Sequence, residues 1–409
     1  MNELNNATRR FIHEHRADDV RQLALQGCRD HEIDLREALI QIAGWQQARS
    51  KLPEWAAIEG VRYPPHLSME QCSSQLTALY KKEILRRLHH AKDEEPGSLT
   101  DLTGGLGIDC SYLAPLFKEV AYIEQQELLC QLAAYNFPLL GITNCHFHHA
   151  DSVGYLRQMD PVEWIYLDPA RRNTQGGKVV AISDCEPDVQ QLEPLLLQKA
   201  RHVLVKLSPM LDLTHALHTL HHVEAAYVVA ADGECKELLL LLGHQPAPSP
   251  QSVPITCTHL HTNGPCEELT YCKADEQQAS LLLTDQPESY LYEPHAALLK
   301  AGAFNFLTQR YPVRKLHPNS HLYTSTEALT EFPGRRFRIT GWSSFGKKEL
   351  KRLVDDLANA NLTVRNFPLT AEVLRKKLKL NDGGPVTLFA TTLSNGKHVL
   401  IRTEAFRTS

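Results

Sequence analysis

The chain has 409 residues, of which 43% are hydrophobic and 22% are charged, a composition typical of a globular protein with two to four domains. No apolar run reaches the roughly 18 residues that a membrane-spanning helix needs. The N-terminus lacks the apolar core of a signal peptide, so we expect a cytoplasmic protein without a membrane partner. Ten cysteines with no Cys-x-x-Cys pair are expected to be reduced thiols rather than a disulfide framework.

The net charge of -5 hides an uneven distribution along the chain. From Arg310 onward there are 18 Lys and Arg residues against 8 Asp and Glu residues, whereas the rest of the chain is acidic. A basic C-terminal region on an acidic body predicts that this region binds an anionic partner. The alternative is a solvated basic surface without a partner.

The N-terminal part is expected to be helical. Residues 21–48 and 63–88 carry apolar residues at helical spacing, and Ser68 is predicted to cap the second helix. The acidic stretch around Glu94 ends this region, so we expect a helical domain over residues 1–95.

The segment SLTDLTGGLGID, residues 98–109, predicts the end of a strand, a glycine-rich turn and the first turn of a helix. Gly104, Gly105 and Gly107 leave room for a ligand or a neighbouring element where a Cβ atom would otherwise lie. The helix N-terminus that follows offers free amide groups to the same ligand. An ordinary strand-to-helix turn without a ligand is the alternative.

Strands and helices alternate after this turn, which predicts a parallel sheet. Each of the first four strands ends in an acidic residue, and ligands of such sheets bind at the carboxyl ends of the strands. These residues are Asp101, Glu124, Asp151 and Asp168. A fifth strand is expected at 202–207. Two further strands, 225–230 and 238–242, have too short a connection for a crossover and must therefore be antiparallel neighbours.

This arrangement resembles the seven-stranded, Rossmann-like fold of class I methyltransferases, expected over residues 96–245. The resemblance implies the cofactor S-adenosyl-L-methionine, with Glu124 on its ribose hydroxyls and Asp151 on its adenine amine. The implied cofactor-binding residues are Asp101, Thr103, Gly104, Gly105, Gly107, Glu124 and Asp151. A nicotinamide-binding domain is the main alternative, but the G-x-G-x-x-G spacing that it needs is absent.

The sequence Asp168-Pro169-Ala170-Arg171-Arg172 resembles the D-P-P-aromatic turn of methyltransferases that modify amines, although it lacks the aromatic residue. The resemblance implies catalytic roles for Asp168, Pro169 and Arg171, because a guanidinium can stack on a base or bind a phosphate. A salt bridge within the protein is the alternative role for the arginines. Methylation at pyrimidine C5 would need a cysteine nucleophile, and Cys185 is the only one nearby.

Two stretches contain several histidines and cysteines. Residues 145–149, CHFHH, are expected to form a strand, whose side chains face both sides and cannot all converge. A second set has no recognised zinc spacing, although four of its members could converge on one ion. This set is Cys257, His259, His261, Cys266 and Cys272. The sequence therefore predicts no metal site.

The C-terminal region is expected to form a small ferredoxin-like α+β subdomain at 255–325 and a further domain at 326–409. A helix is expected to begin near Tyr292, and Asn395-Gly396 predicts a hairpin turn between strands. The region resembles the THUMP-like module of certain bacterial class I methyltransferases, which implies RNA as the partner. Exposed lysines would then contact phosphates without reading sequence. The candidates are Lys347, Lys348, Lys376 and Lys377.

The sequence thus predicts an α/β protein with three parts: a helical N-terminal domain, a class I methyltransferase domain and a small α+β C-terminal region. Its expected activity is S-adenosylmethionine-dependent methylation of a base nitrogen in structured RNA. Two alternatives remain open. One is a methyltransferase for a protein or small molecule, and the other is an RNA-binding module without catalysis. The oligomeric state is not predicted.

Overall fold

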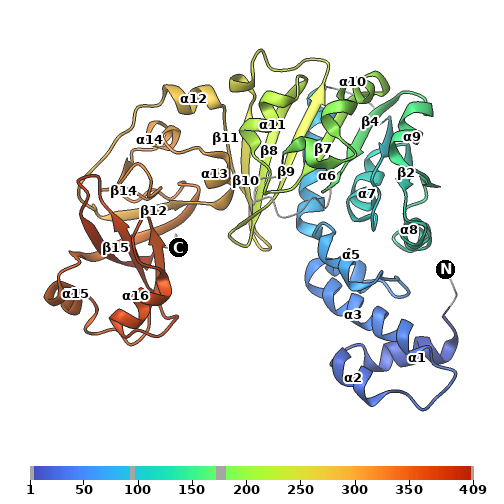
Figure 1. The fold of residues 1–409 in the computed structure, drawn as a ribbon, viewed down its shortest axis with the longest axis horizontal. Helices are drawn as coiled ribbons and strands as arrows, with labels where there is room; N and C mark the ends of the chain where they lie inside the picture. The colour runs from blue at the N-terminus through green and yellow to red at the C-terminus, as the bar shows by residue number, and fades with distance from the viewer. Residues whose placement is uncertain (1–3, 93–96, 172–180, 407–409) are drawn as a thin grey trace. The chain divides into compact units, whose positions relative to one another are not determined.

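The computed structural model describes residues 4–92, 97–171 and 181–406 (Figure 1). The chain divides into two compact units. The first contains the residues up to 224 together with 238–246, and the second contains 225–237 and the residues from 247 onward.

Helices alone make up the N-terminal part of the first unit. They are α1 (Asn6–His15), α2 (Val20–Gln26), α3 (Leu35–Lys51), α4 (Pro53–Ala57), α5 (His66–Gln71) and α6 (Gln75–Lys92). The single helix that we expected after residue 63 is divided, because the backbone leaves the helix at Cys72. Ser68, which we predicted to cap the second helix, instead lies within α5. Ser74 has this role for α6, since its Oγ accepts a hydrogen bond from the amide of Thr77 at 3.2 Å.

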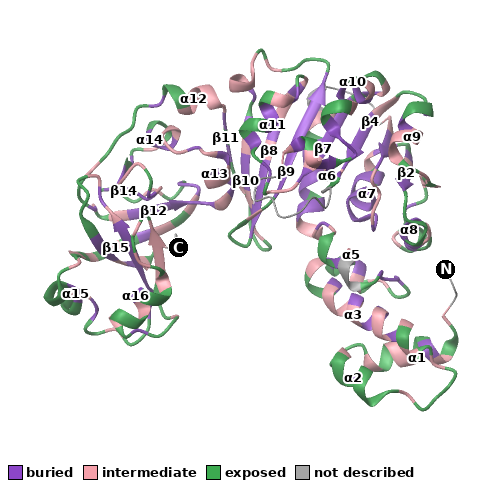
Figure 2. Ribbon diagram, in the orientation of Figure 1, coloured by how far each residue is buried: buried purple, intermediate pink, exposed green. Residues whose placement is uncertain are grey.

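A mostly parallel sheet forms the body of the first unit. Its strands are β1 (Ser98–Asp101), β2 (Glu119–Glu124), β3 (Cys145–His149), β4 (Val162–Leu167), β7 (Ala200–Leu207) and β9 (Glu234–Gly243). They lie in the order β9-β7-β4-β1-β2-β3, and β9 pairs antiparallel with β7 through its residues 238–243. The other pairs are parallel. Strand β1 is thus central, and Figure 2 shows that the strands beside it are largely buried.

Helices connect these strands as the alternating pattern predicts. They are α7 (Ile108–Leu113), α8 (Glu127–Leu139), α9 (Ser152–Gln158), α10 (Val189–Lys199) and α11 (Leu213–Thr219). Short 3₁₀ turns lie at η1 (Ala114–Leu116) and η2 (Ile182–Asp184). A two-stranded ribbon pairs β5 (Ala170–Arg171) with β6 (Cys185–Glu186).

The N-terminal helices pack on the glycine-rich turn and on α7. Leu52, Trp55 and Met69 from the helices share one buried cluster with Leu106 and Ile108. Hydrogen bonds also join the two parts of the unit. The hydroxyl of Tyr112 donates to Glu54 Oε2 at 3.0 Å, and Asn136 exchanges two hydrogen bonds with the backbone of Arg62.

The second unit begins with β8 (Val223–Ala231), of which residues from 225 belong to it. Asp232 and Gly233 follow with φ values of 53° and 78°, the conformation of a two-residue hairpin turn. Strand β10 (Ile255–Leu260) pairs parallel with β8, and β11 (Glu267–Tyr271) pairs antiparallel with β10. The 3₁₀ turn η3 (Pro250–Ser252) precedes β10, and α12 (Lys273–Gln278) follows β11.

A second sheet in this unit has the order β13-β14-β12-β15-β18-β17-β16. Its strands are β12 (Tyr290–Pro294), β13 (Arg314–Lys315), β14 (Tyr323–Ser325), β15 (Gly334–Ser344), β16 (Asn361–Arg365), β17 (Val386–Thr392) and β18 (His398–Ala405). Its helices are α13 (Ala296–Ala301), α14 (Phe306–Arg310), α15 (Lys347–Val354) and α16 (Ala371–Leu378). The predicted Asn395-Gly396 hairpin is confirmed, because β17 and β18 pair antiparallel. The helix expected near Tyr292 is preceded by a strand, and its first residue is Ala296.

Within the described residues, no helix is long and apolar enough to cross a membrane.

Candidate active site

The glycine-rich turn passes directly over β2. Gly104 donates its amide to the carbonyl of Ile123 at 2.8 Å, and a Cβ atom at Gly104 would lie 2.2 Å from the ring of Tyr122. Gly105 and Gly107 have φ values of 60° and 82°, which side-chain-bearing residues rarely adopt. The turn therefore needs glycine at 104 for space and at 105 and 107 for backbone conformation.

Glu124, at the end of β2, links the glycine-rich turn to the turn that precedes α8 through hydrogen bonds. Its Oε2 accepts the amide of Gly105 at 2.7 Å, and its Oε1 accepts the amide of Gln126 at 2.7 Å. The Glu124 residue is buried, with 7% of its surface exposed. A carboxylate has about four acceptor positions, so each oxygen retains one for a further donor.

Asp101 and Thr103 link β1 to the end of β4. Asp101 Oδ1 accepts the amide of Thr103 at 3.0 Å, and Thr103 Oγ1 accepts the amide of Asp168 at 2.6 Å. Burial raises the pKa of the Asp101 carboxyl well above its usual value, and the hydrogen bond from Thr103 opposes this only in part. The two strand ends are therefore held next to each other.

Asp109, in the first turn of α7, is the centre of a buried polar cluster. Its Oδ2 accepts hydrogen bonds from Ser73 at 2.7 Å and Tyr166 at 2.6 Å, and its Oδ1 lies 3.1 Å from Lys81 Nζ. Burial alone would raise the pKa of Asp109. The ammonium groups of Lys81 and Lys206 outweigh this effect and hold the pKa at about 2.

Lys206 connects this cluster to the acidic end of β4. Its Nζ lies 2.5 Å from Asp168 Oδ2 and 3.6 Å from Asp109 Oδ2. The Asp168 side chain is 37% exposed, whereas that of Lys206 is 13% exposed. The carboxylate of Asp168 is therefore partly accessible to solvent, and its orientation is fixed by the largely buried ammonium group of Lys206.

The other predicted site residues lie at the same edge of the sheet in different surroundings. Asp151 is exposed and caps α9, where its Oδ2 accepts the amide of Gly154 at 2.7 Å. Pro169 is buried. Arg171 belongs to β5 and pairs with the buried Cys185 of β6. Arg172 lies outside the described residues.

Lys81, Lys206 and Tyr166 are polar members of this site that the sequence prediction did not assign. A signal for the two lysines is present in the sequence. Lys81 falls on the apolar face of α6, four residues before Leu85, and Lys206 interrupts the apolar run of β7. A buried ammonium needs a carboxylate partner, so cations at such positions indicate an internal ion pair.

The predicted RNA-binding lysines lie on two helices of the second unit. Lys347 and Lys348 begin α15, and Lys376 and Lys377 lie in the last turn of α16. All four are exposed. Both helices insert apolar side chains into one core cluster, which contains Leu350, Val354 and Leu374. Their basic residues are therefore on the outside of the same layer.

The first unit has the fold of a class I methyltransferase, with parallel strands, an antiparallel edge and a glycine-rich turn between β1 and α7. A crystal structure of a candidate methyltransferase from Porphyromonas gingivalis W83 is 37% identical to this chain. The match covers 98% of each chain with a TM-score of 0.87. Residues 290–333 match the model of a ferredoxin-like domain, and residues 334–405 match that of a THUMP-like domain. The chain belongs to the family of bacterial class I S-adenosylmethionine-dependent methyltransferases with a C-terminal THUMP-like domain.

Two more distant structures also match part of the chain. A candidate class I S-adenosylmethionine-dependent methyltransferase from Listeria monocytogenes is 10% identical, with a TM-score of 0.39 over 62% of this chain and 93% of its own. The 16S rRNA N2 G1207 methyltransferase of T. thermophilus is 16% identical, with a TM-score of 0.32 over 46% of this chain and 45% of its own. Neither similarity is close enough to assign a substrate. No curated protein matches the sequence.

Proposed function

We propose that this protein uses S-adenosyl-L-methionine to methylate a base nitrogen in structured RNA. The observation that carries the proposal is the partly exposed carboxylate of Asp168. Asp168 directly follows β4, the strand that pairs with β1, and Lys206 Nζ lies 2.5 Å from its Oδ2.

The residues around the glycine-rich turn fit the proposed cofactor. Glu124 has acceptor positions left for a ribose diol, and the turn brings the amide of Gly105 to the same carboxylate. Asp101, Thr103, Gly104 and Gly107 would line the methionine end. Asp151 would accept the adenine amine while still capping α9. The cofactor supplies an electrophilic methyl group on a sulfonium.

Methyl transfer requires an acceptor lone pair in line with the bond that breaks, so positioning can supply most of the rate enhancement. Asp168 can accept a hydrogen bond from an exocyclic amine, which fixes the direction of the nitrogen lone pair. Pro169 restricts the backbone of this turn. Arg171 follows it in sequence and would contact the base or a phosphate. We assign no covalent step to Cys185, which is buried.

RNA as the substrate is supported by the exposed lysines of α15 and α16 and by the THUMP-like domain to which they belong. Phosphate contacts of this kind fix position and orientation, and they do not read sequence. The substrate nucleotide would then be selected by the shape of the RNA and by the turn at Asp168.

The proposal is tested by the variant Asp168→Ala, with Asp160→Ala as the control for removal of an exposed carboxylate in the same unit. RNA from cells that lack the gene is incubated with each protein and S-adenosylmethionine, and its nucleosides are analysed by mass spectrometry. We expect a methylated base with the control and none with Asp168→Ala. The affinity of both variants for S-adenosylhomocysteine should stay within a few fold of the original.

Two outcomes would contradict the proposal. Full turnover by Asp168→Ala would place the acceptor elsewhere. Unmethylated RNA with the original protein, despite tight binding of S-adenosylhomocysteine, would favour a protein or small-molecule substrate.

A further inference from the structure

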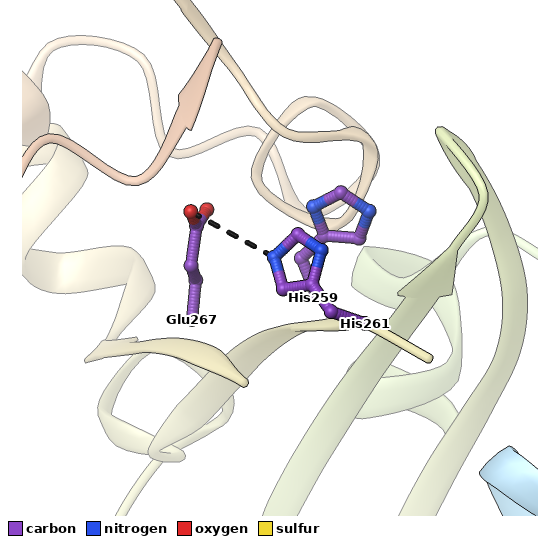
Figure 3. Close-up of side chains that lie close together, drawn as sticks. All are labelled: His259, His261 and Glu267. Atoms are coloured by element: carbon purple, nitrogen blue, oxygen red, sulfur yellow. Dashed lines mark ion pairs between the residues drawn. The ribbon is translucent and has the colours of Figure 1, made fainter. Parts of the chain in front are cut away.

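A second group of chemically reactive side chains lies in the second unit and has no role in the proposed methyl transfer. His259 on β10 pairs across the ladder with Glu267 on β11, and His261 follows two residues after His259. Their ligand atoms all lie within 4.8 Å of one another. Figure 3 shows the carboxylate of Glu267 beside the two imidazole rings.

The pairing of the two strands explains this convergence. His259 lies near the end of β10, and His261 is the first residue after this strand, two positions further on, so that its side chain falls beside that of His259. The antiparallel register places Glu267 opposite His259, and its Oε1 lies 3.8 Å from His261 Nε2. The two rings are 4.5 Å apart between centroids. Two nitrogen donors and one carboxylate therefore converge from two adjacent strands.

Two polar atoms in this region are buried without a hydrogen-bond partner among the described residues. One is Oε2 of Glu267 and the other is Nε2 of His295. His295 is only 5% exposed, and its ring centroid lies 5.5 Å from that of His259. Buried polar atoms are almost always paired, so unpaired ones call for an explanation such as a bound ion or water. A cation would pair with Oε2 of Glu267. A water molecule bound to that cation would provide a hydrogen-bond partner for Nε2 of His295.

The local charge also fits a cation. The uncharged imidazole is the form that binds metals. Glu267 adds a full negative charge, so a divalent ion would leave the group with a modest positive charge in place of an incompletely paired carboxylate.

We propose that His259, His261 and Glu267 bind one divalent first-row transition-metal ion such as Zn²⁺. Two imidazoles and a carboxylate suit zinc and its neighbours in the series, whereas Mg²⁺ and Ca²⁺ prefer oxygen ligands alone. The ion joins β10 to β11 at the end of their ladder. This set differs from the one considered in the sequence, because the described structure brings none of the cysteines into the group and adds Glu267.

The test uses the full-length protein, freed of any affinity tag and stripped with a chelator. Titration with Zn²⁺ by calorimetry should give one equivalent bound with a micromolar or tighter dissociation constant. Co²⁺ should compete for the same site and give the visible absorption of a low-coordinate complex. Saturation with Zn²⁺ should also raise the thermal midpoint by several degrees, because the ion binds the folded state.

The variant His259→Ala/His261→Ala should lose the bound equivalent, the Co²⁺ absorption and the rise in the thermal midpoint. The matched control is His146→Ala/His148→Ala, a pair with the same spacing on β3 for which the structure shows no third ligand among the described residues. This control should keep all three signals. Glu267→Gln should weaken binding by at least roughly 10-fold, because Glu267 is a ligand and even the loss of a group that only supports a ligand costs roughly 10- to 100-fold.

Three outcomes would overturn the proposal. They are no binding above that of the stripped His259→Ala/His261→Ala protein, loss of binding in the control pair, and equal binding of Mg²⁺ and Zn²⁺. The readouts do not depend on methylation, so this test and that of the proposed function can fail separately.

Discussion

Glu124 has two tasks in one carboxylate. It already accepts the amides of Gly105 and Gln126, and the proposed cofactor would add its ribose hydroxyls. Hydrogen bonds to a charged group contribute about 1.5–3 kcal/mol each. Glu124 therefore stabilises the shape of the turn, and under the proposed function it would also contribute to the affinity for the cofactor.

We expect Glu124→Ala to weaken the binding of S-adenosylhomocysteine by roughly 10- to 150-fold, the range that those energies give. Calorimetry measures the effect, with Glu119→Ala at the exposed start of the same strand as the control. Thermal unfolding of each variant shows how much of the change is a loss of stability. If the affinity of Glu124→Ala for S-adenosylhomocysteine is within twofold of that of the unmodified protein, Glu124 does not bind the ribose.

At the scale of elements, the tie between α6 and α7 depends on an ion pair between Lys81 and Asp109, both of which are buried. The pKa of Asp109 is lowered to about 2 in the folded protein from a usual 3.8. A lowered folded-state pKa means that the carboxylate stabilises the fold at pH values above 3.8. This contribution is lost as the pH falls from 3.8 through 2.

We expect Asp109→Asn to destabilise the first unit by about 3–5 kcal/mol at neutral pH, because it leaves the Lys81 charge buried without a carboxylate. Denaturant unfolding measures the loss. The double variant Lys81→Met/Asp109→Asn removes the stranded charge and should recover part of the stability. A loss below about 1 kcal/mol in the single variant would show that the pair does not hold the two helices together.

At the scale of the whole molecule, a basic C-terminal region follows an acidic remainder of the chain, and the proposed RNA partner would bind to the basic region. Each phosphate contact releases counterions, so RNA affinity should fall with salt at a log–log slope of about -0.7 to -0.9 per contact. We expect Lys376→Glu/Lys377→Glu to weaken binding similarly for unrelated structured RNAs and to reduce this slope. Filter binding of a transfer RNA pool across salt concentrations measures both.

The matched control for that experiment is Arg9→Glu/Arg10→Glu, an exposed adjacent basic pair on α1 with the same change in charge. Its salt slope should stay close to that of the original protein. Equal losses in the two double variants would indicate an effect of net charge alone and would remove the assignment to α16.

The order of the elements followed from the sequence because turn residues and acidic strand ends are local signals. Glu124 and Asp168 were predicted in this way. Glu124 is the last residue of β2, and the amide of Asp168 is hydrogen-bonded to Thr103 beside the glycine-rich turn. Lys81 and Glu267 were missed for a different reason. Lys81 pairs with Asp109, which lies on another helix, and Glu267 lies opposite His259 on the neighbouring strand. Contacts of this kind leave no characteristic spacing in the sequence. At Tyr292 the helical pattern was real but began later, because Pro294 ends a strand and His295 caps the helix.

Lys81 has a consequence for the opening of the first unit. Its amine is 0% exposed and is held against Asp109, so an acylating reagent can reach it only while α6 is displaced from α7. Exposed lysines react at all times, whereas modification of Lys81 would proceed only through rare local opening. The rate at which Lys81 is acylated would therefore report how often α6 separates from α7. Acylation would also prevent the two helices from closing again, since the neutral product can no longer pair with the carboxylate of Asp109.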